Sequence, residues 1–324
     1  MTRIRLFPQL TLTVFTLLGL TVTLTELPNS LAVSPVFAQT QDTSKAEADR
    51  LYQQGIQQLE RSQFREAIES WQKSLSIYQE IGDKLGEAYS LGNLGNAYTR
   101  LSQYQKAIEL YQQALPIFQE IGDKLGEAYS LMNLGVTYRN ISQYEKTIEL
   151  YQQALWIFRE IGDIKGEVYT LINLGVVYDV LSQYDKAIEL YQQALSIFQE
   201  IGDRRSEAGS LMNLGIAYNN LSQYEKAIEL YQQALPIFQE IGDRKGVADS
   251  LGNLGNAYRE LSQYEKAIEL CQQALSIFQG IGDRSSEALT LYNLGLTYRA
   301  LGQEQKAREF FEESQAIRQE IGID

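Results

Sequence analysis

The sequence predicts an all-α fold made of seven similar helix hairpins, and three observations support this. A 40-residue period runs along most of the chain, because Ile81-Gly82-Asp83 recurs in step at Ile121, Ile161, Ile201, Ile241 and Ile281. Within each period the apolar residues are spaced as on one face of a helix. A Gly-Asp pair, typical of a helix end followed by a helix start, stands between most periods.

Each period contains two amphipathic segments, and we expect each segment to form a helix. Leu91, Leu94 and Tyr98 share one face of the first segment, which we name helix A. After a short polar break, residues 104–118 repeat the pattern with Tyr, Ala, Ile and Phe, and we name this segment helix B. Each unit is therefore expected to fold as a helix hairpin.

Small residues recur where the two helices of a unit must approach closely. Gly95, Ala107 and Ala114 stand among the large apolar residues of their helices. One hairpin cannot bury such a face alone, so stability is expected from stacking of neighbouring units. The seven units span residues 46–322, with bounds 46–82, 83–122, 123–162, 163–202, 203–242, 243–282 and 283–322.

The first 38 residues have the layout of an export signal. Two arginines precede an uncharged apolar run from Leu10 to Leu24, and Val36 and Ala38 offer small residues at the -3 and -1 positions of a cleavage site. An uncleaved membrane anchor is the alternative, since the uncharged span 6–25 is barely long enough to cross a bilayer. We therefore predict a signal peptide over 1–38, a polar tether over 39–45, and a mature chain in the periplasm or outside the cell without membrane insertion.

Charge and composition exclude several classes of function. The net charge is -13, from 28 basic and 41 acidic residues, so the whole molecule repels nucleic acid. Histidine is absent and Cys271 is the single cysteine, so the sequence offers no thiolate cage for a metal and lacks the commonest general base. We expect no catalytic residues, no metal and no cofactor.

The spaced small and aromatic positions resemble the tetratricopeptide repeat, whose pattern is matched by Leu94-Gly95, Tyr98, Ala107, Tyr111 and Ala114. The period is longer than the common form of about 34 residues, and it is most similar to the long repeats of kinesin light chains and Pins-type scaffold proteins. The resemblance implies an α-solenoid, a right-handed superhelix of stacked hairpins whose concave wall is made by the A helices.

The face of helix A opposite Leu91 is apolar in several units, where a solvated helix would be polar. Two interpretations stay open: these residues bury themselves against the next A helix, or they form a groove for an extended or helical peptide. The residues on this face are Tyr129, Met132 and Val136 in the third unit, Tyr169, Ile172 and Val176 in the fourth, Met212 and Ile216 in the fifth, and Leu289, Tyr292 and Leu296 in the seventh.

An asparagine recurs on the same face. In the repeats that this chain resembles, an Asn at this position binds the ligand backbone, because a carboxamide both donates and accepts hydrogen bonds. The alternative is that each Asn only ties adjacent A helices together. The resemblance makes Asn93, Asn133, Asn173, Asn213, Asn253 and Asn293 candidate binding residues, and Arg139, Arg259 and Arg299 are further candidates that either meet ligand carboxylates or remain solvated.

The sequence thus predicts an exported scaffold that holds a peptide or protein segment along its concave wall. Two alternatives stay open: an array that associates with itself or spaces envelope components, and a regulatory partner of a catalytic protein on another chain. Trp156 stands in a column otherwise held by Pro, Ser or Ala, and both exposure and local packing are open interpretations for it. Cys271 replaces a core Tyr and is expected to be buried.

Overall fold

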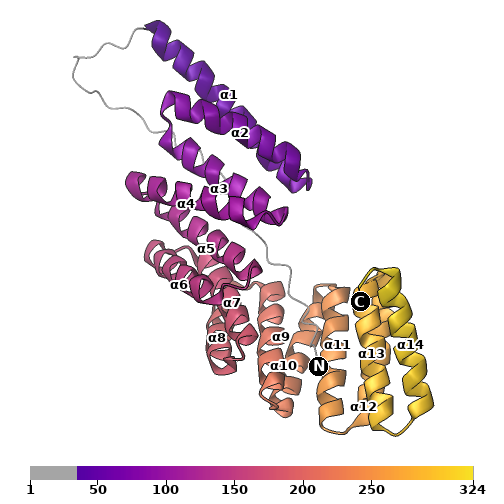
Figure 1. Cartoon of the computed structure of the whole chain (residues 1–324). Coiled ribbons are helices and arrows are strands. Elements are labelled where there is room, and N and C mark those ends of the chain that lie inside the picture. The colour runs from indigo at the N-terminus through magenta and orange to yellow at the C-terminus, as the bar shows by residue number, and fades with distance from the viewer. Residues whose placement is uncertain (1–34, 324) are drawn as a thin grey trace. The chain divides into compact units, whose positions relative to one another are not determined.

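The structure, a computed structural model, describes residues 35–323, and in that range it contains fourteen helices and no strand. A helices have odd numbers and B helices have even numbers (Figure 1). Their bounds are α1 Pro35–Glu60, α2 Phe64–Ile81, α3 Lys84–Arg100, α4 Tyr104–Ile121, α5 Lys124–Asn140, α6 Tyr144–Ile161, α7 Ile164–Val180, α8 Tyr184–Ile201, α9 Arg204–Asn220, α10 Tyr224–Glu240, α11 Arg244–Glu260, α12 Tyr264–Ile281, α13 Arg284–Ala300 and α14 Glu304–Glu320.

The chain divides into two compact parts, an N-terminal part that ends at Asn173 and a C-terminal part that begins at Leu174. Within each part a B helix packs against its own A helix and against the A helix that follows, as α4 does with α3 and α5, and as α10 does with α9 and α11. Successive A helices also touch, as α3 does with α5 and α9 with α11. Each part is therefore a stack in which neighbouring hairpins bury their apolar faces against one another. The predicted all-α class of stacked helix hairpins is confirmed.

The Gly-Asp pairs end one helix and begin the next, as the sequence predicts. Gly82 has a φ of 76°, a left-handed conformation that costs glycine little because it lacks a Cβ. Asp83 then accepts a hydrogen bond from the backbone N–H of Gly86 at 3.0 Å, which satisfies one of the free amides of the first turn. The same cap recurs at later A helices.

The turn between helix A and helix B uses serine in a left-handed conformation. Ser102 has a φ of 57°, and the equivalent serine has a φ of 57° to 60° in each of the first six hairpins. Gly302 takes this position in the last hairpin, with a φ of 78°. The serine turns therefore carry a small backbone strain that the last turn avoids.

The glycine in the middle of helix A lets an aromatic ring of helix B reach the backbone. A Cβ added to Gly95 would lie 2.8 Å from the ring of the buried Tyr111, and one added to Gly175 would lie 2.5 Å from the ring of Tyr191. Any larger residue would displace a ring in a filled core. Helix A and helix B are thereby held at a short separation.

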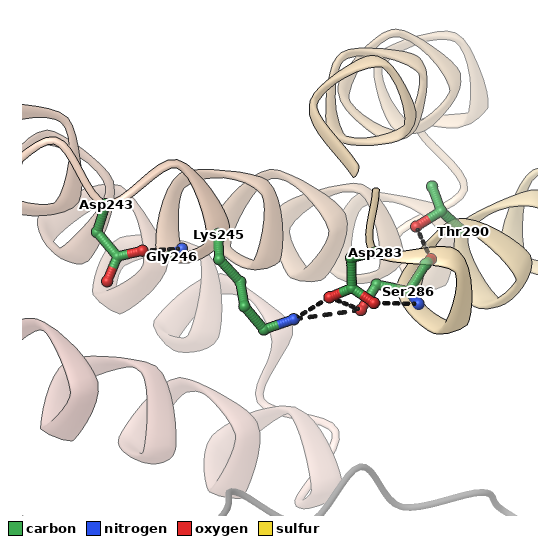
Figure 2. Close-up of polar contacts among 6 residues, drawn as sticks. All are labelled: Asp243, Lys245, Gly246, Asp283, Ser286 and Thr290. Carbon is green, nitrogen blue, oxygen red and sulfur yellow. Dashed lines mark hydrogen bonds and ion pairs between the residues drawn. The ribbon is translucent and has the colours of Figure 1, made fainter. Parts of the chain in front are cut away.

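An ion pair connects successive repeats at the start of helix A. Lys245 on α11 reaches the capping Asp283 at the start of α13, while Asp283 also accepts from the backbone and hydroxyl of Ser286 (Figure 2). Arg205 holds Asp243 in the same way. At these junctions the contact fixes the position of one A helix relative to the A helix before it.

The N-terminal part of the fold differs from the prediction. Residues 39–45, expected as a tether, lie inside α1, which begins at Pro35. The physical reason is that this segment has no Gly or Pro to stop a helix, and Pro is favoured at the first helical position. The start of the predicted signal peptide, residues 1–34, lies outside the described residues.

Candidate functional site

The six predicted asparagines fall into two groups that differ in exposure. Asn93 and Asn133 are completely buried and Asn173 is 2% exposed, whereas the equivalent residues of α9, α11 and α13 are only partly buried. The prediction that all six line an open groove therefore needs correction for the first three. The partly exposed members are Asn213, Asn253 and Asn293.

Asn93 illustrates why the buried members are not accessible. Its Nδ2 donates a hydrogen bond at 2.8 Å to the phenol oxygen of Tyr52, which lies on the preceding A helix, α1. Burial strongly raises the pKa of Tyr52, so this phenol stays neutral. The carboxamide of Asn93 therefore ties α3 to α1, which is the structural alternative to ligand binding.

Much of the predicted apolar wall is also buried by neighbouring helices. Met132 and Val136 of α5 are 1% and 3% exposed, and Val176 is buried as well. Met212 of α9 is covered by α11, because the Ser250 hydroxyl lies 3.2 Å from its sulfur. For these four residues the structure corrects the groove interpretation, since a side chain enclosed by its neighbours cannot meet a ligand.

Tyr129 acts at a junction between repeats. Its phenol donates to the capping carboxylate of Asp163 at 2.9 Å, and burial with this contact raises its pKa above the ordinary range. Leu125 stands where Lys245 stands in a later repeat, so the phenol replaces the missing cation. The side chain is half-buried, and its hydroxyl is occupied by the junction.

Accessible side chains of the predicted wall gather on α9, α11 and α13, which all belong to the C-terminal part. We define the open strip as Asn213, Ile216, Asn253, Asn256, Asn293 and Leu296, all partly exposed. The side chains of Asn213, Asn253 and Asn293 make no hydrogen bond within residues 35–323. Tyr292 at 43% exposure adds an aromatic ring beside Phe311 at the end of the strip. Tyr169 and Ile172 of α7 are also accessible and belong to the N-terminal part.

Two of the three predicted arginines accompany the open strip. Arg259 donates to Asn256 at 3.3 Å and to Glu260 at 2.8 Å, and Arg299 is exposed with its guanidinium 5.3 Å from the Phe311 ring centre. Arg139 differs because it is largely enclosed, and burial lowers its pKa. The strip is therefore accompanied by one exposed cation, Arg299, since Arg259 is already paired with Glu260.

A sequence signal distinguishes open from buried asparagines, although the prediction did not use it. The residue four positions before each buried Asn is a tyrosine, as in the pair Tyr89 and Asn93. Before the three open asparagines this residue is Gly209, Asp249 or Leu289. Residues four apart are neighbours on a helix surface, so a tyrosine stands beside each buried asparagine and a smaller residue stands beside each open one.

The next features are the possible metal ligands and the cysteine within residues 35–323. Between residues 35 and 323 no three side chains of His, Cys, Asp or Glu are grouped so that they could hold a metal ion. Cys271 is buried, as expected, and burial raises the pKa of its thiol to about 11. None of the helices described is both long and apolar enough to cross a membrane.

A family model for the tetratricopeptide repeat matches the chain over residues 46–120, 126–200, 166–240, 206–279 and 246–320. No curated protein sequence matches the chain.

Several solved structures share the fold at low sequence identity. RapI in its apo form is 18% identical with a TM-score of 0.69, covering 85% of this chain and 99% of that chain. A signal transduction ATPase with a tetratricopeptide repeat sensor, from Pyrococcus horikoshii, is 21% identical with a TM-score of 0.74, covering 87% of this chain and 43% of that one. A putative kinesin light chain from Podosopora anserina with TPR-like repeats is 23% identical with a TM-score of 0.53, covering 60% and 95%.

Proposed function

The chain belongs to the tetratricopeptide repeat family, and from that premise we propose that it is an exported scaffold that binds an extended protein segment along the open strip. The family fold is in general a scaffold for protein interactions, without catalytic residues of its own. A Rap protein of the same fold, 16% identical with a TM-score of 0.59, has been solved in complex with competence and sporulation factor. Binding of a peptide or protein is thus the function that the fold favours.

The observation that carries this proposal is the set of three carboxamides on successive A helices. Asn213, Asn253 and Asn293 are partly exposed and have no partner within the described part of the chain. Each carboxamide can donate to a ligand carbonyl and accept from a ligand N–H, which suits the backbone of an extended segment. Three such groups along one wall can engage a segment at three points.

Apolar and charged residues beside the three asparagines limit the chemical class of the ligand. Ile216 and Leu296 offer partly exposed aliphatic surface beside the asparagines, which favours a segment with apolar side chains. Arg299 stands exposed at this strip and has no ion pair within the described residues, so a ligand with carboxylates nearby is favoured over a basic one. Hydrogen bonds of about 0.5 to 1.5 kcal/mol each do not select a sequence by themselves, so these neighbours supply selectivity.

Export is the second part of the proposal, and it is supported by the order of charged, apolar and small residues in the first 38 positions. The experiment is fractionation of cells that make the chain with a C-terminal tag, followed by N-terminal sequencing of the tagged product. A product that begins near residue 39 outside the cytoplasm supports cleavage and export. An intact product in the membrane fraction supports the anchor, and an intact cytoplasmic product contradicts both.

Capture of binding partners tests the strip. The full tagged chain and the variant Asn213→Ala, Asn253→Ala, Asn293→Ala are compared in the same exported fraction, and the triple variant is expected to lose partners that the native chain retains. The matched control removes three exposed carboxamides from the B helices α8, α10 and α12 of the C-terminal part, at Gln192, Gln233 and Gln272. Equal capture by the folded triple variant and the native chain would remove the open strip as the binding site.

A further inference from the structure

A single exposed tryptophan distinguishes one B helix from the others. Trp156 on α6 is 63% exposed, although its column holds the exposed Pro116 in the preceding repeat and the exposed Ser196 in the following one. The surrounding sequence is nearly the same in the three helices, so the fold does not require a large ring at this position. An exposed indole with no packing requirement is a feature that binding explains.

The indole borders a shallow hollow between α5 and α6. Glu149 and Gln152 line this hollow from α6, and Lys124 with Glu127 lines it from α5. Glu160 lies four residues beyond Trp156 and therefore on the same side of the helix, exposed to solvent. One aromatic ring is thus flanked by two carboxylates on a single helix face.

The charges at this surface are unbalanced in favour of the carboxylates. Lys124 is already paired with Glu127 at 3.1 Å, and Arg159 is paired with Glu167 at 2.7 Å. By contrast, Glu149 and Glu160 form no ion pair with any residue between 35 and 323. The free charge around the indole is therefore negative.

We propose that the α6 surface formed by Trp156, Glu149 and Glu160 is a docking site for an arginine or lysine side chain of a partner protein. A cation over an indole is attracted by the electrons of the ring face, and tryptophan is the strongest aromatic partner for a cation. The two carboxylates add charge complementarity from either side. This surface lies on α6, a B helix of the N-terminal part, so it is a different site from the open strip and does not depend on it.

Tryptophan fluorescence measures occupancy directly, because the chain has only one other tryptophan. Trp71 is completely buried and donates to the backbone oxygen of Tyr52 at 3.1 Å, whereas Trp156 is open to a soluble quencher such as acrylamide. Tetra-arginine amide is titrated into the full chain at low salt, and acrylamide quenching is expected to decrease as the indole becomes covered. Trp156→Ser, which copies Ser196, is expected to abolish the signal without lowering the melting temperature.

Carboxylate variants test the charge argument. The double variant Glu149→Gln, Glu160→Gln is expected to weaken tetra-arginine binding by about 2- to 5-fold. This is the change in affinity that the loss of one exposed ion pair or cation–π contact produces. The matched control Glu189→Gln, Glu200→Gln makes the same charge change on α8, where Ser196 replaces the tryptophan, and should leave binding unchanged. Ser196→Trp is expected to create a second site on α8.

Three results would overturn the proposal. Equal protection by a neutral apolar peptide would mean that the indole binds without regard to charge. Protection that grows with protein concentration in the absence of peptide would assign the surface to a second copy of this chain. A fall in melting temperature of Trp156→Ser, together with no effect of tetra-arginine on native quenching, would mean that the ring only packs against its own repeat.

Discussion

Two glycines of α9 differ in what a single methyl group would meet. A Cβ added to Gly215 would lie 2.3 Å from Cε1 of Tyr231, and Tyr231 is only 2% exposed. Ordinary contact begins at 3.4 Å, so the buried ring must move by about 1 Å. A Cβ added to Gly209 would meet nothing within 4 Å. The same chemical change is therefore expected to have opposite effects at two positions of one helix.

The magnitudes follow from two competing terms. Alanine in a helix interior is favoured over glycine by about 0.5 to 1 kcal/mol, and this gain applies at both positions. Overpacking a filled core costs about 1 to 3 kcal/mol, and this cost applies only at Gly215. Gly209→Ala should therefore raise the free energy of unfolding by up to about 1 kcal/mol. Gly215→Ala should lower it by the difference between the two terms, which is about 1 kcal/mol at mid-range and at most about 2.5 kcal/mol.

Thermal unfolding followed by helical circular dichroism compares both variants with the native chain. A repeat array need not unfold in one step, so melting temperatures are compared under identical conditions. A Gly215→Ala variant as stable as Gly209→Ala would show that the Tyr231 ring moves freely, and the argument for close approach of helices A and B would fail.

Three further predictions concern the turns, the junctions and pH. Ser222→Gly should stabilise the chain by about 0.5 to 1 kcal/mol, because Ser222 has a φ of 60° and Gly302 already fills the equivalent position; a lower melting temperature would contradict this. Lys245→Met should cost at most about 1 kcal/mol, and this loss should shrink in high salt because the pair with Asp283 is partly exposed; a salt-independent loss would point to packing instead. Burial raises the pKa of Asp249 to about 6, so the protonated carboxyl is favoured by the fold, and its contribution to stability is present below pH 4 and lost as pH rises through 6. The melting temperature of Asp249→Asn relative to native should therefore be higher at pH 7 than at pH 4.5, and a constant difference would refute the shift.

The helices could be predicted from the sequence because their signals are local. Capping Asp83, the left-handed Gly82 and the spacing of Leu91, Leu94 and Tyr98 are all read within a few residues. The extension of α1 over residues 39–45 was not predicted, because polar residues without Gly or Pro are compatible with either a helix or a tether.

The candidate site could be predicted only in part. The sequence indicates which face of each A helix points away from Leu91, and the structure places the open strip on that face. Which asparagines are accessible depends on distant contacts, such as the hydrogen bond between Asn93 and Tyr52, 41 residues apart. A helical pattern gives the direction of a side chain and does not say whether a neighbouring repeat covers it.

The sequence alone determined that this protein is an array of helix hairpins with a repeated asparagine, since the period and the caps are properties of single repeats. Tertiary structure decided which repeats are open. Met132 and Asn133 are enclosed by neighbouring helices, while Asn213 and Asn253 remain accessible, although all four occupy the same face of their A helices. The physical reason is that burial depends on the side chains that adjacent repeats contribute, and these differ where the repeats themselves look alike.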